Sequence, residues 1–485
     1  MAGEGCNGGA RMIEEELTQS SEAGSVFPAV DPATGKVLAW LPRGGAAEID
    51  RAVAQARRAF EAERSWRQPA TRARVLNAIA RAIELQAEPL AVLESRDTGK
   101  PLTQARTDVT VAARYFQYYA GWADKVYGQQ IPLGDGYLDY TLREPWGVCG
   151  QIIPWNYPLQ VSSRLVAPAL AVGNAVVLKP AEEASLTAVR LGEIARAEGL
   201  PNGLLQVITG LGEEAGAALV EHPGIDHLSF VGSPAVGALI AQAAARRLVP
   251  VSLELGGKSP QVVFPDADLD LAVPVIVRAL IQNAGQTCSA GSRLIAHTAI
   301  YDELLTRLKE RLETIRVGPG LEDPDLGPLI SASQFERAHG MTQRAIAGGA
   351  RLVSGGARAV GPALDAGYFF QPTLLADVSL HSEIWSEEVF GPVLAATSFH
   401  DEDEAVALAN STAYGLVAGL WTRDLSRAHR LSRRIRAGQV YINTFGAGGG
   451  VELPFGGYQR SGYGRGKGQE AILAFSQVKN ICAAL

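Results

Sequence analysis

The chain has few cysteines, and their placement excludes several kinds of protein. Only Cys6, Cys149, Cys288 and Cys482 occur among 485 residues, and no two of them form a CxxC motif. A disulfide framework or a cysteine-ligated zinc site is not expected, because both need numerous or closely spaced cysteines. Scattered free thiols suit a reducing compartment, so we expect the protein to be cytoplasmic and to hold no metal.

Long apolar runs are also missing. No stretch is long enough to span a bilayer, so no membrane association is expected. Residues 1–19 contain acids and glycines instead of the apolar core of a signal peptide. We predict that residues 1–25 form a disordered leader and that translation could begin at Met1 or at Met12.

Positive charge is in the minority. Lysine and arginine number 44 against 51 acidic residues, which gives a net charge of −7 and argues against a nucleic-acid-binding surface. Hydrophobic residues at 47% and charged residues at 20% are typical of a soluble globular protein. A chain of 485 residues exceeds one ordinary hydrophobic core, so two or more domains are expected.

The most informative segment surrounds Cys288. Residues 282–293 read Gln-Asn-Ala-Gly-Gln-Thr-Cys-Ser-Ala-Gly-Ser-Arg, so small and polar side chains flank the thiol. A nucleophilic thiol needs space for a substrate carbon and backbone N–H donors for the oxyanion that follows. A buried structural cysteine is the other reading of this segment.

Two further segments carry candidate polar groups. Glu254 stands where an apolar run ends at Gly256-Gly257, and a partly buried carboxylate there can act as a general base. Asn156 lies in Pro-Trp-Asn-Tyr-Pro at 154–158, where its amide can donate to an oxyanion. The alternatives are a surface glutamate at a strand end and an Asx turn that caps the next helix.

Short apolar runs alternate with helical patterns along most of the chain. This β-α-β alternation predicts a mainly parallel, doubly wound sheet, followed after Gly257 by a second α/β domain that carries Cys288. The predicted strands lie at 148–153, 175–178, 205–208, 228–231 and 249–253, then at 261–264, 294–296, 394–397 and 439–443, with a C-terminal strand at 474–483.

Seven segments in order resemble the NAD(P)-dependent aldehyde dehydrogenase superfamily, of the hydrolytic type that does not acylate CoA. The three segments above are joined by Leu-Lys-Pro-Ala-Glu at 178–182, Phe-Val-Gly-Ser at 230–233, Glu-Glu-Val-Phe-Gly-Pro at 387–392 and Pro-Phe-Gly-Gly at 454–457. The resemblance covers nearly the whole chain. It implies an α/β fold with two doubly wound domains, one for the cofactor and one for catalysis, and a small β oligomerisation element.

The resemblance also implies a division of the chain. The NAD-binding domain would comprise 26–123 and 142–255, and the catalytic domain 256–443. Residues 124–141 and 468–485 would form the oligomerisation element of a homodimer or homotetramer. Residues 444–467 would line the active site.

By the same resemblance, Cys288 attacks the aldehyde carbon to form a thiohemiacetal, and hydride transfer to the nicotinamide leaves a thioester. The Asn156 amide and the Cys288 N–H would hold the oxyanion, and water activated by Glu254 would release the carboxylic acid. A CoA-acylating relative tends to lack the base, and a silent structural homologue would be expected to lose Cys288 or Glu254; both residues are present.

The expected cofactor is NAD. Gly232-Ser233 follows a predicted strand and opens a helix, where free N–H groups can hold a pyrophosphate. The Glu182 carboxylate would bind ribose hydroxyls and repel a 2′-phosphate, so NAD should be preferred over NADP; a solvated pair of Lys179 and Glu182 is the other reading. The residues that the resemblance assigns to the cofactor are Ile152, Ile153, Trp155, Lys179, Glu182, Gly212, Gly216, Phe230, Gly232, Ser233, Val236, Leu255, Glu388 and Phe390.

The expected substrate is a medium-sized or aromatic aldehyde, or a semialdehyde. Residues 446–450 have little side-chain bulk, which suggests a wide tunnel mouth. Arg164 could favour an acid-bearing semialdehyde, or could point away to a structural carboxylate. The resemblance places these residues in the aldehyde tunnel: Tyr157, Val161, Arg164, Thr287, Ser289 and Phe455.

Two positions depart from the family pattern. Leu165 stands where relatives often have lysine, and Gly466 where they have glutamate. The resemblance places this charge pair behind the general base. Losing both charges together avoids leaving one of them buried and unpaired. If the positions are neighbours, restoring lysine and glutamate together should recover a loss caused by either alone.

Overall fold

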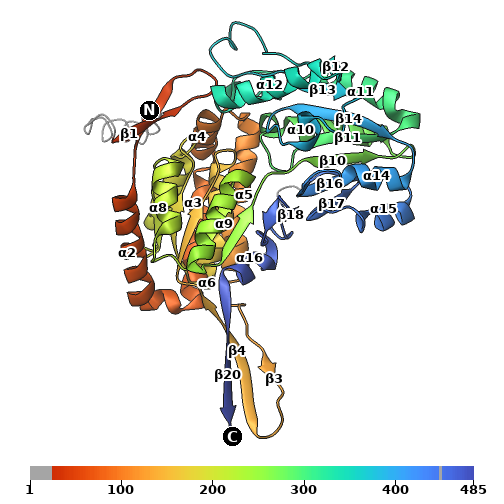
Figure 1. Ribbon diagram of the computed structural model, residues 1–485. Helices are drawn as coiled ribbons and strands as arrows, with labels where there is room; N and C mark the ends of the chain where they lie inside the picture. The colour runs from red at the N-terminus through yellow and green to blue at the C-terminus, as the bar shows by residue number, and fades with distance from the viewer. Residues whose placement is uncertain (1–24, 447–449) are drawn as a thin grey trace.

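A computed structural model describes residues 25–446 and 450–485, and shows two lobes with a thin arm projecting from one of them (Figure 1). The predicted leader and Cys6 therefore lie outside the described residues, apart from Ser25. So do residues 447–449 of the predicted wide tunnel mouth. No helix in the described ranges is both long and apolar enough to cross a membrane.

The first lobe is built on a six-stranded sheet. Its strands run in the order β19-β9-β8-β5-β6-β7, and only β19 is antiparallel to its neighbour. Their bounds are β5 (Val148–Ile152), β6 (Ala175–Lys179), β7 (Leu205–Val207), β8 (His227–Val231), β9 (Val251–Glu254) and β19 (Gly462–Tyr463).

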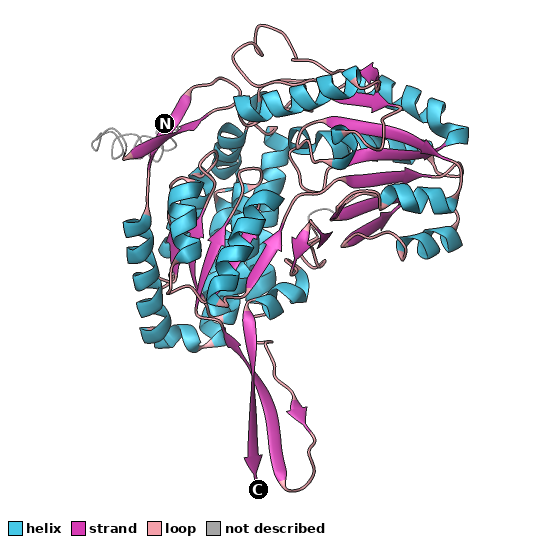
Figure 2. Ribbon diagram, in the orientation of Figure 1, coloured by secondary structure: helices cyan, strands magenta, loops and turns pink. Residues whose placement is uncertain are grey.

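Helices cover both faces of this sheet (Figure 2), so its central strands are buried throughout and are apolar without alternation. From β5 the chain first adds β6 and β7 on one side of the sheet, and then adds β8 and β9 on the other side of β5. Ligands of such sheets bind where the strand order changes side, outside the carboxyl ends of the strands. The helices are α2 (Ala46–Ala62), α3 (Pro69–Leu85), α4 (Ala87–Thr98), α5 (Leu102–Ala120), α6 (Pro158–Val172), α7 (Leu186–Ala197), α8 (Ala217–Glu221) and α9 (Pro234–Arg247).

The second lobe has a seven-stranded sheet with its own hydrophobic core. The strand order is β12-β13-β14-β11-β10-β16-β17, parallel except between β12 and β13. The strands are β10 (Ser259–Val263), β11 (Gly291–His297), β12 (Arg351–Ser354), β13 (Thr373–Ala376), β14 (Val393–Phe399), β16 (Val417–Trp421) and β17 (Gln439–Ile442). The helices are α10 (Leu269–Ile281), α11 (Tyr301–Glu313), α12 (Ala332–Ala347), α13 (Glu383–Ser386), α14 (Glu402–Ala409) and α15 (Leu425–Ser432).

The arm joins segments that are far apart in the sequence. β20 (Ser476–Ala484) pairs antiparallel with β4 (Tyr137–Pro145), which also pairs with β3 (Gln130–Ile131). The C-terminus lies at its tip (Figure 1), and α16 (Gly468–Ala474) connects it to the body. Several apolar side chains on it are exposed: Tyr137, Leu138, Leu142 and Val478. The smaller pairs are β1 (Val26–Val30) with β2 (Val37–Pro42), and β15 (Tyr414–Gly415) with β18 (Tyr458–Gln459).

The prediction of two doubly wound α/β domains is confirmed. Each predicted strand exists, with ends that shift by a few residues: Glu254 belongs to β9, and Ala474 ends α16 instead of starting the last strand. The sequence patterns missed β12, β13 and β16. They also missed β19, which returns from the second lobe to complete the first sheet beside Glu254.

Candidate active site

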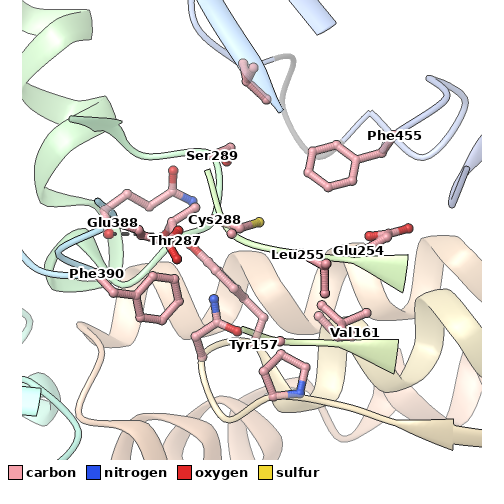
Figure 3. A pocket seen from close by; sticks show the side chains of 18 of the residues that line it. Tyr157, Val161, Glu254, Leu255, Thr287, Cys288, Ser289, Glu388, Phe390 and Phe455 are labelled. Atoms are coloured by element: carbon pink, nitrogen blue, oxygen red, sulfur yellow. Dashed lines mark hydrogen bonds between the residues drawn. The ribbon is translucent and has the colours of Figure 1, made fainter. Parts of the chain in front are cut away.

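One cavity of about 960 Å³ lies where the two lobes meet. The first lobe contributes the loop after β5 and the ends of β8 and β9. The second lobe contributes the loop before β11 and the segment after α13. Figure 3 shows Cys288 with Glu388 and Phe390 on one side of it and Glu254 on the other. All three predicted catalytic residues, Cys288, Glu254 and Asn156, line this cavity.

Cys288 follows a tight turn with unusual backbone angles. Asn283 and Ala284 have φ values of 49° and 55°, a left-handed conformation that non-glycine residues adopt only where surrounding contacts impose it. Gly285, at φ 72°, leaves no room for a Cβ, which would stand 2.3 Å from the Gly391 carbonyl. Tight packing of this turn therefore fixes the position of the thiol.

Burial raises the pKa of the Cys288 thiol to about 12, although nearby Arg164 acts in the opposite direction. Burial in an apolar setting disfavours the thiolate, and an adjacent cation favours it. The thiol is therefore protonated at rest near neutral pH. Attack on a carbonyl requires a group that removes this proton.

Asn156 is buried, and one hydrogen bond holds its side-chain amide. Its Nδ2 donates to the Gln286 carbonyl at 2.8 Å, in the turn just before Cys288, and its Oδ1 has no hydrogen-bond partner among the described residues. A carboxamide has two N–H donors, so a second N–H remains for a ligand. The predicted oxyanion role is compatible with this arrangement.

Lys100 holds the backbone of Asn156, a contact that the sequence did not suggest. Its Nζ donates to the Asn156 carbonyl at 2.9 Å, to Asp108 at 2.5 Å and to Glu94 at 3.2 Å, and lies 4.3 Å from the Tyr157 ring centroid. The Lys100 and Glu94 side chains are fully buried. We define Lys100, Glu94 and Asp108 as the Lys100 cluster; all three of the lysine's donors have acceptors.

Glu254 meets a cation at the other side of the cavity. β9 ends at this residue and β19 pairs with it, so its backbone is fixed from both neighbouring strands. Its carboxylate forms an ion pair with Arg164 from α6, and both side chains are only 7% exposed. The sequence left Arg164 either in the substrate tunnel or against a structural carboxylate. It lines the cavity, and the carboxylate it contacts is the predicted base itself.

Lys467 completes this group and was missed by sequence reasoning. Arg164 and Lys467 lie 5.3 Å and 5.2 Å from the centroid of the Phe455 ring, and both line the cavity. Burial and then Arg164 lower the pKa of Lys467 to about 8, while Glu254 acts in the opposite direction. We define Arg164, Glu254 and Lys467 as the Arg164 cluster. Only the position of Lys467 after the unusual Gly466 could have drawn attention to it.

Gly466 lies against Glu254, the predicted base, which is the position that the family resemblance implied for residue 466. A Cβ at Gly466 would stand 2.2 Å from Glu254 Oε1, and its N–H and C=O both bond to Phe455 at 2.7 Å. A glutamate at position 466 would therefore displace Glu254. Leu165 is buried, and its carbonyl accepts a bond from Gln151. Restoring lysine and glutamate together is no longer expected to recover the single losses.

The cofactor side of the cavity has a glycine turn at a helix start. Gly232 has no space for a side chain, since a Cβ would stand 2.4 Å from the Phe230 ring. Ser233 caps α9 by accepting a bond from Val236 N at 3.3 Å. The N-terminal N–H groups of a helix are suited to bind a phosphate group.

Glu388 and Phe390 line the same cavity as this turn. Glu388 Oε1 accepts a bond from Gly257 N at 3.0 Å, and burial raises the pKa of this carboxyl to about 7. Phe390 has φ 58° and meets the Trp155 ring edge-on at 5.3 Å between centroids. A carboxylate such as that of Glu388 can accept hydrogen bonds from ribose hydroxyls, and an apolar ring such as that of Phe390 can pack against a planar ring of a cofactor.

A second group of predicted cofactor residues lies beyond the cavity wall, at the end of β6. Lys179 Nζ contacts Glu182 Oε2 at 2.7 Å, and Glu182 Oε1 accepts from Gly212 N at 3.3 Å. Burial opposes ionisation of Glu182, but Lys179 together with backbone hydrogen bonds, including the one from Gly212, lowers the pKa of the carboxyl overall. Gly216 packs beside Ile152, where a Cβ would lie 3.9 Å from Cδ1.

The cavity brings together all six predicted substrate residues, and Tyr157 OH bonds to Thr287 Oγ1 at 2.7 Å. It also includes part of the predicted cofactor set: Trp155, Gly232, Ser233, Leu255, Glu388 and Phe390. The remaining ones do not line it: Ile152, Ile153, Lys179, Glu182, Gly212, Gly216, Phe230 and Val236.

Comparison with known proteins shows to which family the chain belongs. The model of the aldehyde dehydrogenase family matches residues 18–481. Aldehyde dehydrogenase family 2 member B4, mitochondrial, of Arabidopsis thaliana is 44% identical over 470 residues, which cover 96% of this chain and 86% of that protein. Benzaldehyde dehydrogenase, mitochondrial, of Antirrhinum majus is 42% identical, with coverage of 96% and 86%.

A solved structure extends the likeness to three dimensions. The NAD+ complex of aldehyde dehydrogenase from Bacillus cereus superposes with a TM-score of 0.94 at 38% identity, covering 98% of both chains. The fold and site define a two-domain α/β protein with a cysteine in the cleft between its lobes. The chain belongs to the aldehyde dehydrogenase family.

Proposed function

We propose that the protein oxidises an aldehyde to its carboxylic acid with NAD, through a thioester on Cys288 that water hydrolyses. The observation that carries this proposal is the meeting of Cys288, Asn156 and Glu254 on one cavity, from three distant parts of the chain. A thiol, an amide donor and a carboxylate are the nucleophile, oxyanion donor and base that such chemistry needs.

Each residue has one task in this scheme. Cys288 attacks the carbonyl carbon as the thiolate, after its proton has passed to solvent in the open cavity, and the second N–H of Asn156 stabilises the oxyanion. After oxidation, Glu254 accepts a proton from a water molecule, and the resulting hydroxide attacks the thioester. The carbon–sulfur bond then breaks with its electron pair on the sulfur, which releases the acid and leaves Cys288 as a thiolate that can take up the proton held by Glu254.

The residues present fit NAD. A side chain at Gly232 would collide with the Phe230 ring, so the backbone beside the start of α9 stays uncovered, and Glu388 and Phe390 line the same cavity. When bound, NAD supplies the hydride acceptor. We infer that Glu182, held by Lys179 and Gly212, accepts bonds from the adenosine ribose hydroxyls and repels a 2′-phosphate. NAD is therefore preferred over NADP.

The substrate class remains the one that the sequence favoured: a medium-sized or aromatic aldehyde, or a semialdehyde. A cavity of about 960 Å³ has room for cofactor and substrate parts larger than acetaldehyde. The relative named as a benzaldehyde dehydrogenase supports an aromatic aldehyde. The two cations near Glu254 support an acid-bearing one.

We also infer a cytoplasmic homo-oligomer, a dimer or tetramer, with no nucleic-acid or membrane partner. The projecting β4–β20 pair with its exposed apolar side chains supports the assembly.

A steady-state assay tests the proposal. NADH formation is measured with NAD, a panel of aldehydes, and CoA added or withheld. We expect turnover without CoA, and loss of at least about 10³-fold in the Cys288→Ala variant while NAD still binds. Replacing the exposed Cys482 by alanine is the matched control and should leave turnover near wild type. Activity that requires CoA would instead favour the acylating reaction, and no activity with intact NAD binding would favour a silent homologue.

A further inference from the structure

The cavity carries an excess of positive charge beside the predicted base. Arg164 and Lys467 approach the Phe455 ring, and one carboxylate, Glu254, is paired with Arg164. Arg164, Lys467 and Glu254 all line the cavity, so a second carboxylate bound beside the Phe455 ring would meet the Arg164 guanidinium and a lysine as well as Glu254.

The guanidinium of Arg164 is buried without a full set of acceptors. Its Nε has no hydrogen-bond partner among the described residues, and neither has Oε2 of Glu254. The contact of that oxygen with Arg164 Nη2 is therefore an ion pair without hydrogen-bond geometry. Arg293, buried to a similar degree, shows the usual arrangement: it donates to Lys258, Leu408, Ser411 and Ala409. A buried donor left unpaired costs free energy, which a ligand acceptor would restore.

The same ion pair restrains the base. Glu254 Oε2 is engaged with Arg164 Nη2, so this oxygen is not available to accept a proton from water while the pair is intact. Glu254 is predicted to remove a proton from water, so it has to leave Arg164 or share it during hydrolysis. A second carboxylate at Arg164 would allow this without leaving the guanidinium unpaired in the protein interior.

We propose that the substrate is an aldehyde acid whose carboxylate binds Arg164 in exchange for Glu254, so that binding of the substrate anion releases the base. This inference rests on the proposed aldehyde oxidation. Lys467 contributes a further positive charge at the same place. A neutral aldehyde can still acylate Cys288, but its thioester is hydrolysed slowly because Glu254 stays with Arg164.

The first test compares an aldehyde acid with its neutral ester. Succinic semialdehyde and its methyl ester are supplied with NAD, and NADH is followed in the burst and the steady state. We expect kcat/KM to favour the acid by about 10- to 100-fold, the range of one charge-assisted hydrogen bond. The ester should show a burst followed by slow turnover, and the acid should show none. Equal kcat/KM values, or bursts of equal size, would overturn the proposal.

The second test changes Arg164. In Arg164→Gln the preference for the acid should fall below about threefold, and the ester's burst should shrink because Glu254 is no longer held. Arg164→Lys keeps the charge and should keep part of the preference. Arg114→Gln, at an exposed arginine paired with Glu452, is the matched control and should leave both substrates unchanged. An undiminished preference in Arg164→Gln would overturn the proposal.

A binding measurement covers the case in which Arg164→Gln does not fold. In the Cys288→Ala variant, butyrate and butyramide are titrated by calorimetry with NAD present. Butyrate should bind at least about tenfold more tightly, and equal binding would overturn the proposal. These experiments distinguish a failure of the proposed carboxylate exchange from a failure of the proposed aldehyde oxidation. Oxidation of neutral aldehydes without preference for the acid refutes only the exchange, whereas no NADH from any aldehyde refutes both.

Discussion

The Lys100 cluster and the Arg164 cluster are both buried groups of cations and carboxylates, yet they differ in how completely their donors are used. All three donors of Lys100 have acceptors, one of them the Asn156 carbonyl, and none of this group lines the cavity. Arg164 contacts one carboxylate, has an unpartnered Nε, and lines the cavity. A buried group whose hydrogen-bond donors all have acceptors holds the structure in place, whereas a donor without an acceptor beside a cavity can bind a ligand.

The largest effect is expected when the carboxylate of the Arg164 cluster is neutralised. Glu254→Gln should lower steady-state turnover by about 10²–10⁴-fold, because water loses its base, while a burst of NADH persists. Rapid-mixing absorbance at the NADH band measures both phases. Glu452→Gln, at an exposed ion pair, is the control. Unchanged burst and steady-state rates would show that Glu254 is not the base.

Removing the cation of the Lys100 cluster should act mainly on stability. Lys100→Met leaves Glu94 and Asp108 buried without a partner, so the free energy of unfolding should fall by about 3–5 kcal/mol. Arg164→Gln should cost less, because the cavity admits water to Glu254. Denaturant unfolding measures both, with exposed Lys125→Met expected to change it by less than about 1 kcal/mol. If Lys100→Met and Arg164→Gln lower the free energy of unfolding by equal amounts, the two clusters do not differ in their contribution to stability.

A smaller effect should follow from crowding Glu254. The Cβ in Gly466→Ala would stand 2.2 Å from Glu254 Oε1, so the carboxylate has to move and overpacking should cost about 1–3 kcal/mol. Thioester hydrolysis should slow more than the burst. Gly136→Ala, where a Cβ meets nothing within 4 Å, is the matched control. If Gly466→Ala hydrolyses the thioester at the wild-type rate, the exact position of Glu254 does not matter.

The smallest effect is expected at a third ion pair, Lys179 with Glu182. Glu182→Ser removes the carboxylate that repels a 2′-phosphate, so the ratio of kcat/KM for NADP over NAD should rise by about tenfold, as one lost charge interaction allows. Steady-state assays with both cofactors measure this ratio. A wild-type preference for NADP, or a ratio that does not move, would contradict the role of Glu182.

Much of this fold could be predicted because buried parallel strands leave continuous apolar runs, as at β6 and β8. Cys288, Glu254 and Asn156 could be found because short motifs surround them. The two clusters could not, since Arg164 and Lys467 approach Glu254 from separate helical and loop segments, and no local pattern encodes such a meeting. Strand β12 was missed because it lies at the edge of its sheet and none of its residues is buried, and β13 was missed because it is only four residues long although all of them are buried.

The short strand β19 has a consequence for engineering. The chain leaves β17 in the second lobe, passes Phe455 on the tunnel wall, and then pairs with β9 beside Glu254 before reaching Gly466 and Lys467. Grafting this loop from another member of the family, in order to reshape the tunnel, would also exchange the residues that touch the base. A chimera made to accept a new aldehyde would thus inherit a different rate of acid release, and both properties would have to be selected together.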